Sequence, residues 1–163
     1  MESISSTLLR KADQNTTDTI RRYERIAPYY DLMGSTAEKR VHPWRTKLWA
    51  AVKGDSLLEV GVGTGKNMPY HPQGPHITAT NLTPCMLQRA QQRAQELRLD
   101  GRLDLRWGDV QAMEFSSDSF DSAIATCVFC SVPDPIQGLR EVARVVRPGG
   151  QVVLLEQYAS TRL

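Results

Sequence analysis

A stretch in the first half of the chain joins an apolar run to closely spaced glycines. Residues 57–67 have the sequence Leu-Leu-Glu-Val-Gly-Val-Gly-Thr-Gly-Lys-Asn, with glycines at positions 61, 63 and 65. Apolar runs of this kind are typical of buried parallel strands, and glycines directly after a strand let the backbone approach a ligand without Cβ atoms in the way. Because open α/β sheets bind ligands at the carboxyl ends of their strands, the sequence predicts a small-molecule site after a first strand at 56–60.

Strand and helix patterns alternate after this loop. Further strands are predicted at 77–82, 102–107, 120–128 and 151–156. One helix is predicted after Thr83-Pro84, to about Leu99, and another begins at Asp134-Pro135 and ends before Pro148-Gly149-Gly150. Alternation of this kind predicts right-handed βαβ units, and hence an α/β fold with a doubly wound, Rossmann-like parallel sheet.

Two helices are expected before the first strand. Residues 17–33 carry apolar side chains at helical spacing with a break at Pro28, and residues 35–52 form a second candidate helix. We expect the N-terminal helical segment 1–53 to cover the ligand site of the core, 54–163, as a lid. The apolar residues expected to face inward from the helices are Trp44, Leu48, Trp49, Val52, Met86, Leu87, Ala90, Ala94, Leu97, Ile136, Leu139, Val142 and Val146.

Composition narrows the class of protein. A chain of 163 residues is most simply one domain. Its net charge of +2 is too small to favour nucleic acid or an anionic membrane as a partner, and no apolar run is long enough to span a bilayer. Three cysteines without a recognisable export signal predict reduced thiols and a cytoplasmic location.

The spacing of the glycines separates three classes of ligand. A nucleotide P-loop needs a glycine where Val60 stands and Ser or Thr where Asn67 stands. A dinucleotide fingerprint needs a glycine at the position of Lys66, which weakens that interpretation without excluding it. In the third class, Asp or Glu precedes a G-x-G-x-G sequence by two residues, as Glu59 does here.

This third pattern resembles the first motif of class I S-adenosylmethionine (SAM) dependent methyltransferases. The similarity continues in order along the chain, and it is closest to the ubiquinone/menaquinone biosynthesis methyltransferases and their phospholipid and thiol methyltransferase relatives. The segments that carry it are 22–33, 80–87, 108–111, 119–121, 130–132 and 144–150. The resemblance implies a SAM-dependent enzyme acting on a small-molecule acceptor.

The resemblance also implies a role for individual residues. Glu59 is expected to attract the ammonium group of SAM, and Asp109 to accept a hydrogen bond from the adenine amino group. Tyr23 and Tyr30 are expected to cover the pocket, although tyrosines at helical spacing also occur as ordinary core residues. The complete set of expected SAM-binding residues is Tyr23, Tyr30, Glu59, Gly61, Gly63, Gly65, Asn81, Leu82, Asp109, Val110 and Thr126.

Asn81 departs from the family pattern. The second strand of such enzymes usually ends in Asp or Glu, which accepts hydrogen bonds from both ribose hydroxyls. An amide oxygen still accepts, but it lacks charge assistance worth on the order of 1 kcal/mol per bond. We therefore expect weakened SAM binding, and a catalytically degenerate SAM-binding module is the alternative to an active enzyme.

The remaining polar residues nominate no catalytic base and no metal site. Cys127 and Cys130 form a C-x-x-C without further ligands at familiar spacing, so we interpret them as incidental, with Cys130 near the substrate. His71 is expected to be a solvated loop residue rather than a base. Methyl transfer needs a base only if the acceptor must lose a proton, so a thiol, quinol or phenol, amine or lipid head group all fit.

The end of the predicted sheet raises a separate question. The family sheet usually continues past the fifth strand to an antiparallel hairpin, which this sequence lacks. The unpaired edge of strand five would then need a cover. A truncated chain, a homodimer that covers this edge and a natural short form all remain open.

Overall fold

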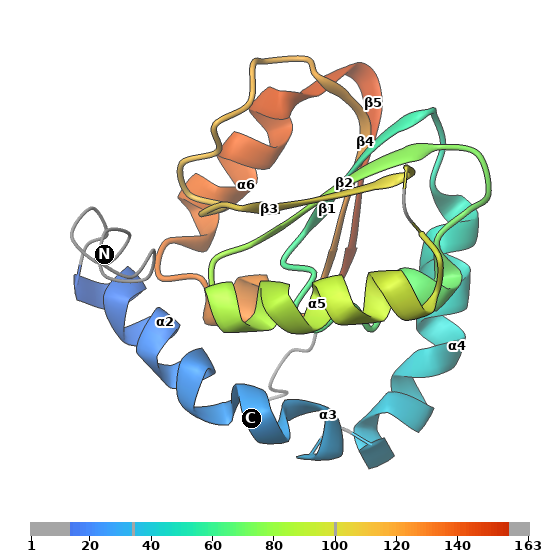
Figure 1. Ribbon diagram of the computed structural model, residues 1–163. Helices are drawn as coiled ribbons and strands as arrows, with labels where there is room; N and C mark the ends of the chain where they lie inside the picture. The colour runs from blue at the N-terminus through green and yellow to red at the C-terminus, as the bar shows by residue number, and fades with distance from the viewer. Residues whose placement is uncertain (1–13, 34, 100, 157–163) are drawn as a thin grey trace, which may run out of the picture.

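The computed structural model describes residues 14–33, 35–99 and 101–156, and Figure 1 shows the arrangement of its helices and strands. The helices are α2 (Gln14–Ile26), η1 (Ala27–Tyr29), α3 (Tyr30–Met33), α4 (Ser35–Ala51), η2 (Met68–Tyr70), α5 (Pro84–Glu96), η3 (Phe129–Ser131) and α6 (Pro135–Val145). The strands are β1 (Ser56–Val60), β2 (His76–Asn81), β3 (Leu103–Trp107), β4 (Phe120–Thr126) and β5 (Val146–Leu155). The outer parts of the predicted segments 1–53 and 54–163 lie outside the described residues.

The five strands form one parallel sheet in the order β3-β2-β1-β4-β5. β1 lies at the centre, with Leu58 opposite Thr78 of β2 on one side and opposite Ala123 of β4 on the other. The chain first builds the sheet outward through β2 and β3, then returns to the other side of β1. This reversal confirms the predicted doubly wound α/β fold, and it opens a crevice at the carboxyl ends of β1 and β4.

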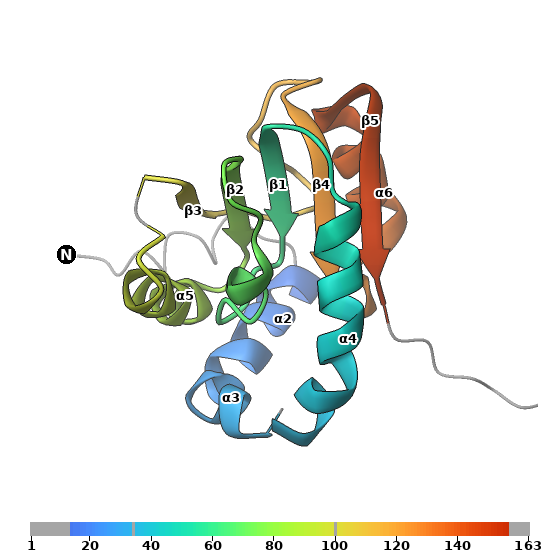
Figure 2. The ribbon, with the colours of Figure 1, turned by 90° about the vertical axis from the view of Figure 1, so that its right-hand side faces the viewer.

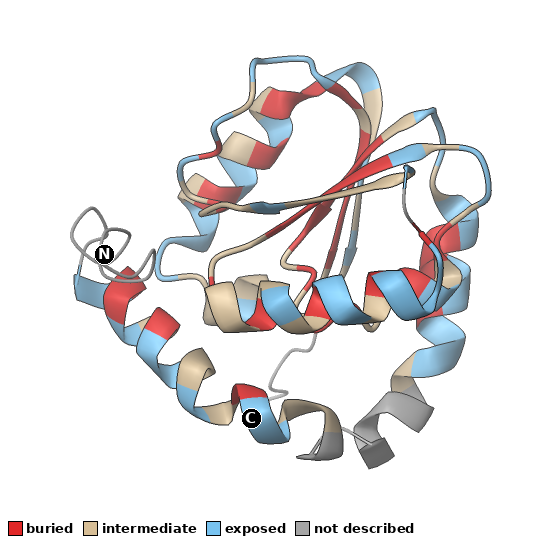
Figure 3. Ribbon diagram, viewed as in Figure 1, coloured by how far each residue is buried: buried red, intermediate tan, exposed pale blue. Residues whose placement is uncertain are grey.

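Helices cover both faces of the sheet because its central strands are apolar on both sides. Leu58 and Ala123 pack with Val142 and Val145 of α6 on one face. Leu57, Ile77 and Ile124 face the other way and pack against Leu48 and Trp49 of α4, while α5 covers Ala79 beside them. Figure 3 shows that buried residues are concentrated in the central strands of the sheet. The second half of the predicted lid segment is thus part of the core packing.

The N-terminal elements lie beyond the carboxyl ends of the strands. Figure 2 shows the arrowheads of the central strands pointing toward α2 and α3. Pro28 forms the predicted break, because a single turn of 3₁₀-helix replaces the α-helix at Ala27–Tyr29. A helical cover therefore lies on the side of the sheet where a ligand is expected.

Several helical residues that were predicted to face inward are exposed. Leu97 follows the last residue of α5 and is 40% exposed, because the chain turns at Arg98, whose φ is 54°. Trp44, Ile136 and Leu139 are also exposed, so the apolar faces of α4 and α6 are narrower than periodicity predicted. Val146 is buried as predicted, but as the first residue of β5 rather than in a helix.

β5 begins five residues earlier than predicted. Val146 already pairs with Phe120, and the register then shifts before Ser122 pairs with Gln151. The Pro148-Gly149-Gly150 sequence therefore forms an irregularity within the strand instead of the turn before it. In the described part of the chain, β5 pairs only with β4 and no antiparallel hairpin follows; a homodimer over this edge stays a prediction. No described helix is long and apolar enough to span a bilayer.

Candidate functional site

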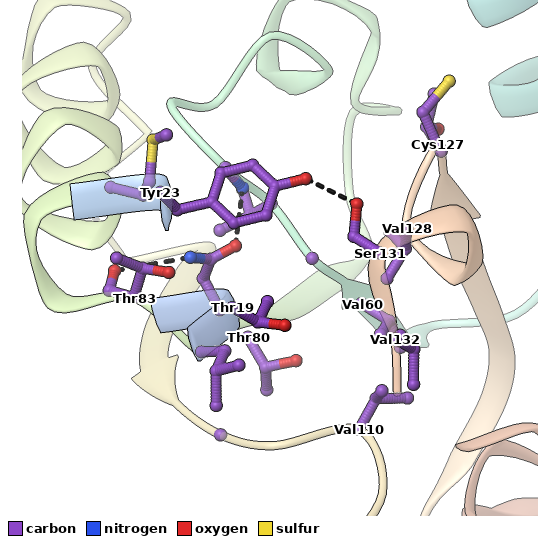
Figure 4. A pocket seen from close by; sticks show the side chains of 18 of the residues that line it. Thr19, Tyr23, Val60, Thr80, Thr83, Val110, Cys127, Val128, Ser131 and Val132 are labelled. Atoms are coloured by element: carbon purple, nitrogen blue, oxygen red, sulfur yellow. Dashed lines mark hydrogen bonds between the residues drawn. The ribbon is translucent and has the colours of Figure 1, made fainter. Parts of the chain in front are cut away.

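A cavity opens at the carboxyl ends of the strands, beneath the N-terminal helices. Its walls come from the glycine loop, the ends of β2 and β4, the loop after β3, and side chains of α2 and α3 (Figure 4). All the predicted site residues line it except Glu59 and Gly65; those that do are Tyr23, Tyr30, Gly61, Gly63, Asn81, Leu82, Asp109, Val110 and Thr126. The fold thus gathers most of the candidates into one site.

The glycines of the loop have different roles. Gly61 lines the cavity with a φ of 68°, and a Cβ there would lie 2.5 Å from a methyl group of Val128. Gly65 does not line the cavity; its φ is 82°, and its Cβ would lie 2.7 Å from the Sδ atom of Met68. Gly61 therefore lets the backbone form the cavity wall, whereas Gly65 lies beneath the wall and is favoured there by its left-handed φ.

Glu59 lies behind the cavity wall. Its side chain is fully buried, with Oε1 accepting a hydrogen bond of 2.7 Å from Nδ2 of Asn67. Oε2 lies 2.8 Å from Nε2 of His71, which is also buried. The structure thus does not bring this carboxylate to the cavity surface, where the sequence placed it.

The prediction that His71 is a solvated loop residue is wrong. It lies beneath the ring of Trp49, with ring centroids 4.5 Å apart, and it pairs with Glu59. A buried carboxylate requires hydrogen-bonding partners, and His71 supplies one of them. The loop after the glycines thus turns inward and brings His71 against Glu59.

Asn67 connects this buried pair to the cavity. Its Nδ2 group donates to Glu59 and, at 3.2 Å, to Oγ1 of Thr126 at the end of β4. Its Oδ1 accepts a hydrogen bond from the guanidinium of Arg45 in α4. Asn67, Thr126 and Arg45 all line the cavity, so one amide joins three elements at its wall.

On the other side of β1, the side chain of Asn81 holds the glycine loop against β2. Its Oδ1 accepts a hydrogen bond of 3.1 Å from the N–H of Gly63, and its Nδ2 lies 3.3 Å from the carbonyl oxygen of Thr83. Beyond it, Asp109 follows β3 and accepts from the backbone and side chain of Gln111. An acidic and an amide side chain thus line this half of the cavity.

Two tyrosines line the covering side. The hydroxyl groups of Tyr23 and Ser131 lie 2.6 Å apart, which joins α2 to the loop after β4 across the cavity (Figure 4). The ring of Tyr30 lies 6.4 Å from that of Tyr23, with the Lys66 ammonium 4.7 Å from its centre. Burial, with smaller contributions from Tyr23 and Cys127, raises the pKa of Tyr30, so its phenol stays protonated at neutral pH.

The loop after β4 presents Cys127 rather than Cys130 to the cavity. Cys127 lines it with a φ of 54°, whereas Cys130 is exposed and does not line it. Glu156 fixes this loop from outside by accepting hydrogen bonds from the N–H groups of Val128 and Phe129. Cys130, which the sequence placed near the substrate, thus lies outside the cavity lining, and Cys127 is the cysteine that lines it.

The sequence patterns did not identify several residues that line the cavity as binding candidates. These residues are Thr19, Arg45, Lys66, Asn67, Ser131 and Val132. Lys66 and Asn67 directly follow the glycines, and this adjacency is a signal that could have identified them. Arg45 carries no comparable signal. It is one of several basic residues in its helix, and it lies far from the glycine loop in the sequence.

Comparison with known proteins supplies a family for this arrangement. The methyltransferase domain family matches residues 58–154. A phosphatidylethanolamine N-methyltransferase of Cereibacter sphaeroides is 33% identical over 139 residues, which cover 85% of this chain and 68% of that protein. A demethylmenaquinone methyltransferase of Listeria welshimeri is 32% identical over 142 residues, which cover 82% of this chain and 60% of that protein.

The fold recurs among solved structures. The cyclase SpnF superposes with a TM-score of 0.76 at 21% identity, covering 89% of this chain and 61% of that one. At this identity the likeness concerns the fold alone. The chain thus spans about 60% of the length of both the menaquinone relative and this structural neighbour.

Proposed function

Starting from the premise that this chain belongs to the methyltransferase domain family and is a SAM-dependent methyltransferase, we propose that SAM lies along the cavity from β3 to β4. The adenine amino group faces Asp109 and the backbone of Val110, and the ribose faces Asn81 and Leu82. The methionine end lies against Gly61, Gly63 and Thr126. The observation that carries this proposal is the convergence of these residues, from separate loops, on one cavity.

The donor and acceptor groups along the cavity support this orientation. Asp109 is the only carboxylate among the described lining residues, and it lies beside β3, at one edge of the sheet. Strands lie about 4.8 Å apart, so the ends of β3 and β4 are separated by roughly 14 Å, which suits an extended ligand. A carboxylate at this end suits an amino group and disfavours a phosphate.

The acceptor is proposed to enter between the tyrosines and the loop after β4. SAM supplies a methyl group that is already activated by its sulfonium, so the protein mainly has to align the acceptor with it. Tyr30 and Tyr23 present phenols, and Ser131 and Cys127 lie opposite them. The raised pKa makes Tyr30 a hydrogen-bond donor toward the acceptor rather than a base.

We further propose that residues 14–33, the described part of the predicted lid before α4, form the movable cover. They contact the rest of the site through polar pairs such as Tyr23–Ser131, and they bury Ile20. None of their described residues belongs to the core clusters of the sheet, whereas Leu48 and Trp49 of α4 do. An acceptor of the kinds named above would enter when this cover opens. Because relatives are named for phosphatidylethanolamine and demethylmenaquinone, we include a lipid amine and a quinol among the acceptors to test.

Transfer of a radiolabelled methyl group from SAM tests this function. The acceptors are thiols, quinols and amines, including vesicles that contain phosphatidylethanolamine, with SAM binding measured in parallel by calorimetry. We expect binding, transfer to one class, and at least about tenfold weaker SAM binding by Asp109→Ala, because a charge-assisted hydrogen bond is lost. Asp104→Ala, on β3 but outside the cavity, is the matched control.

The outcomes separate the alternatives. SAM binding without transfer to any acceptor would favour the degenerate binding module. If SAM does not bind at all, or if Asp104→Ala weakens binding as much as Asp109→Ala, the proposed site is wrong.

A further inference from the structure

Arg45 is a buried cation at the wall of the cavity. Its side chain projects from α4, the residue is 8% exposed, and it lines the cavity together with Asn67 and Thr126. Among the described lining residues the charged side chains are Arg45, Lys66 and Asp109. The carboxylate of Asp109 follows β3. Arg45 instead donates a hydrogen bond to Asn67, which contacts Thr126 at the end of β4.

The orientation of Arg45 is set by a chain of hydrogen bonds. An asparagine amide has two N–H donors and one oxygen. Nδ2 of Asn67 donates to Glu59 and to Thr126, so the oxygen must point the other way, toward Arg45. The buried Glu59 carboxylate, itself held by His71, therefore fixes which side of Asn67 the guanidinium meets.

Packing of α4 adds a second restraint. Trp49 lies four residues after Arg45, on the same side of the helix. Its ring packs against His71, and its side chain joins the core with Leu57 and Ile124. The helix is thus fixed beside the loop that holds Asn67, and the guanidinium is placed before any ligand arrives.

We infer that Arg45 binds the α-carboxylate of the methionine moiety of SAM, an inference that rests on the proposed function. This carboxylate is the anionic group of SAM, and the proposed orientation directs it to the Thr126 end of the cavity. Burying a carboxylate is costly unless it is paired, and a guanidinium pairs with both of its oxygens. Lys66 is the competing cation, but Asp31 and the ring of Tyr30 hold it on the covering side.

Two ligands, one with and one without the amino-acid end that carries this carboxylate, test the assignment. S-adenosylhomocysteine carries the amino-acid end, whereas 5′-methylthioadenosine keeps the adenosine and the sulfur without it. We expect Arg45→Met to weaken S-adenosylhomocysteine binding by about 10- to 100-fold in calorimetry, the range for a lost hydrogen bond to a charged group. Binding of methylthioadenosine should change less than about twofold, and Arg45→Lys should recover part of the loss because it restores the charge.

Lys47→Met is the matched control, since Lys47 lies on the same helix but is exposed over the ring of Trp44. It should leave the affinities for both ligands unchanged. Equal losses for both ligands in Arg45→Met, or a selective loss in Lys66→Met instead, would overturn the assignment. Unchanged S-adenosylhomocysteine binding with a raised KM for the acceptor would also overturn it, and would move Arg45 to the acceptor. If wild-type protein bound neither ligand, the proposed function itself would fail.

Discussion

Asn81 joins the last residue of β2 to the glycine loop, so its identity affects both the shape of the cavity and its chemistry. The amide oxygen accepts from Gly63, and the amide nitrogen faces the Thr83 carbonyl. Both functional groups therefore have partners within the protein. A ribose hydroxyl has to share the amide oxygen with Gly63, which is consistent with the expectation of weakened SAM binding.

Replacement of Asn81 by aspartate tests its role. The carboxylate keeps the bond from Gly63 with one oxygen. Its other oxygen, which replaces the Nδ2 that donates to Thr83, has to turn away from that carbonyl and toward the ribose, and both bonds are then charge-assisted. We expect Asn81→Asp to bind SAM on the order of fivefold more tightly by calorimetry, corresponding to about 1 kcal/mol. Asn81→Ala, which removes the acceptor, should bind more weakly than wild type. Equal or weaker binding by the aspartate variant would remove Asn81 from the ribose site.

For single residues, the sequence predicted which residues lie near the site but not the direction in which each side chain points. The spacing of Glu59 before the glycines correctly indicated a family, but it could not show that the carboxylate points away from the cavity. That direction depends on Asn67 and His71, which approach only because the loop after Gly65 folds inward. Asp109 and Thr126 follow strands directly, so their position at the cavity was predictable from topology.

At the scale of elements, Asp31 links the helical cover to the rest of the site. It lies in α3, and its carboxylate accepts from Thr64 of the glycine loop at 2.6 Å and from Arg89 of α5 at 3.1 Å. Arg93 and Lys66 lie within 4.0 Å of it. Burial raises the pKa of Asp31, but these hydrogen bonds and charges outweigh it, and the pKa is lower than that of a free carboxyl.

A pH-dependent contribution to stability follows from this contact. A lowered carboxyl pKa stabilises the folded state above the unfolded pKa, about pH 4, and this stabilisation is lost as the pH falls through the folded pKa. We expect Asp31→Asn to reduce the free energy of unfolding at pH 7 by about 1 kcal/mol, a small value because the site is partly exposed. Urea unfolding from pH 7 to pH 3 should show the difference shrinking below about pH 4.

Asp18→Asn provides the comparison for this experiment. Asp18 lies on α2 and pairs with Arg21 at 3.7 Å, with both side chains more than half exposed. This substitution should leave stability nearly unchanged across the pH range. If the difference in free energy of unfolding between wild type and Asp31→Asn grew toward low pH, the proposed contribution of the Asp31 carboxylate to stability would be contradicted.

The bounds of the strands were predicted with different accuracy. β1 was predicted at its observed bounds, because it is a buried strand with a nearly continuous apolar run. β2 and β3 were predicted to within a residue at each end, and in β3 the signal is the alternation of Leu103, Leu105 and Trp107 with charged residues. The start of β5 was missed because glycine and proline usually mark turns. Here pairing of Val146 with Phe120 incorporates them into a strand, an effect of the neighbouring strand that local sequence does not carry.

At the scale of the whole molecule, the strand order determines where each part of the ligand can lie. β1 is central, and the reversal between β3 and β4 places Asp109 and Thr126 on opposite sides of the glycine loop. The N-terminal helices then cover the opening from the side toward which the strands point (Figure 2). The proposed order of groups from adenine to methionine therefore follows from topology rather than from any single residue.

A structure of the protein with S-adenosylhomocysteine bound tests this ordering most directly. We predict that the adenine lies beside Asp109 and Val110, the ribose beside Asn81, and the homocysteine end beside Asn67 and Thr126. A ligand bound in the reverse direction, or outside the cavity beneath α2 and α3, would contradict the account.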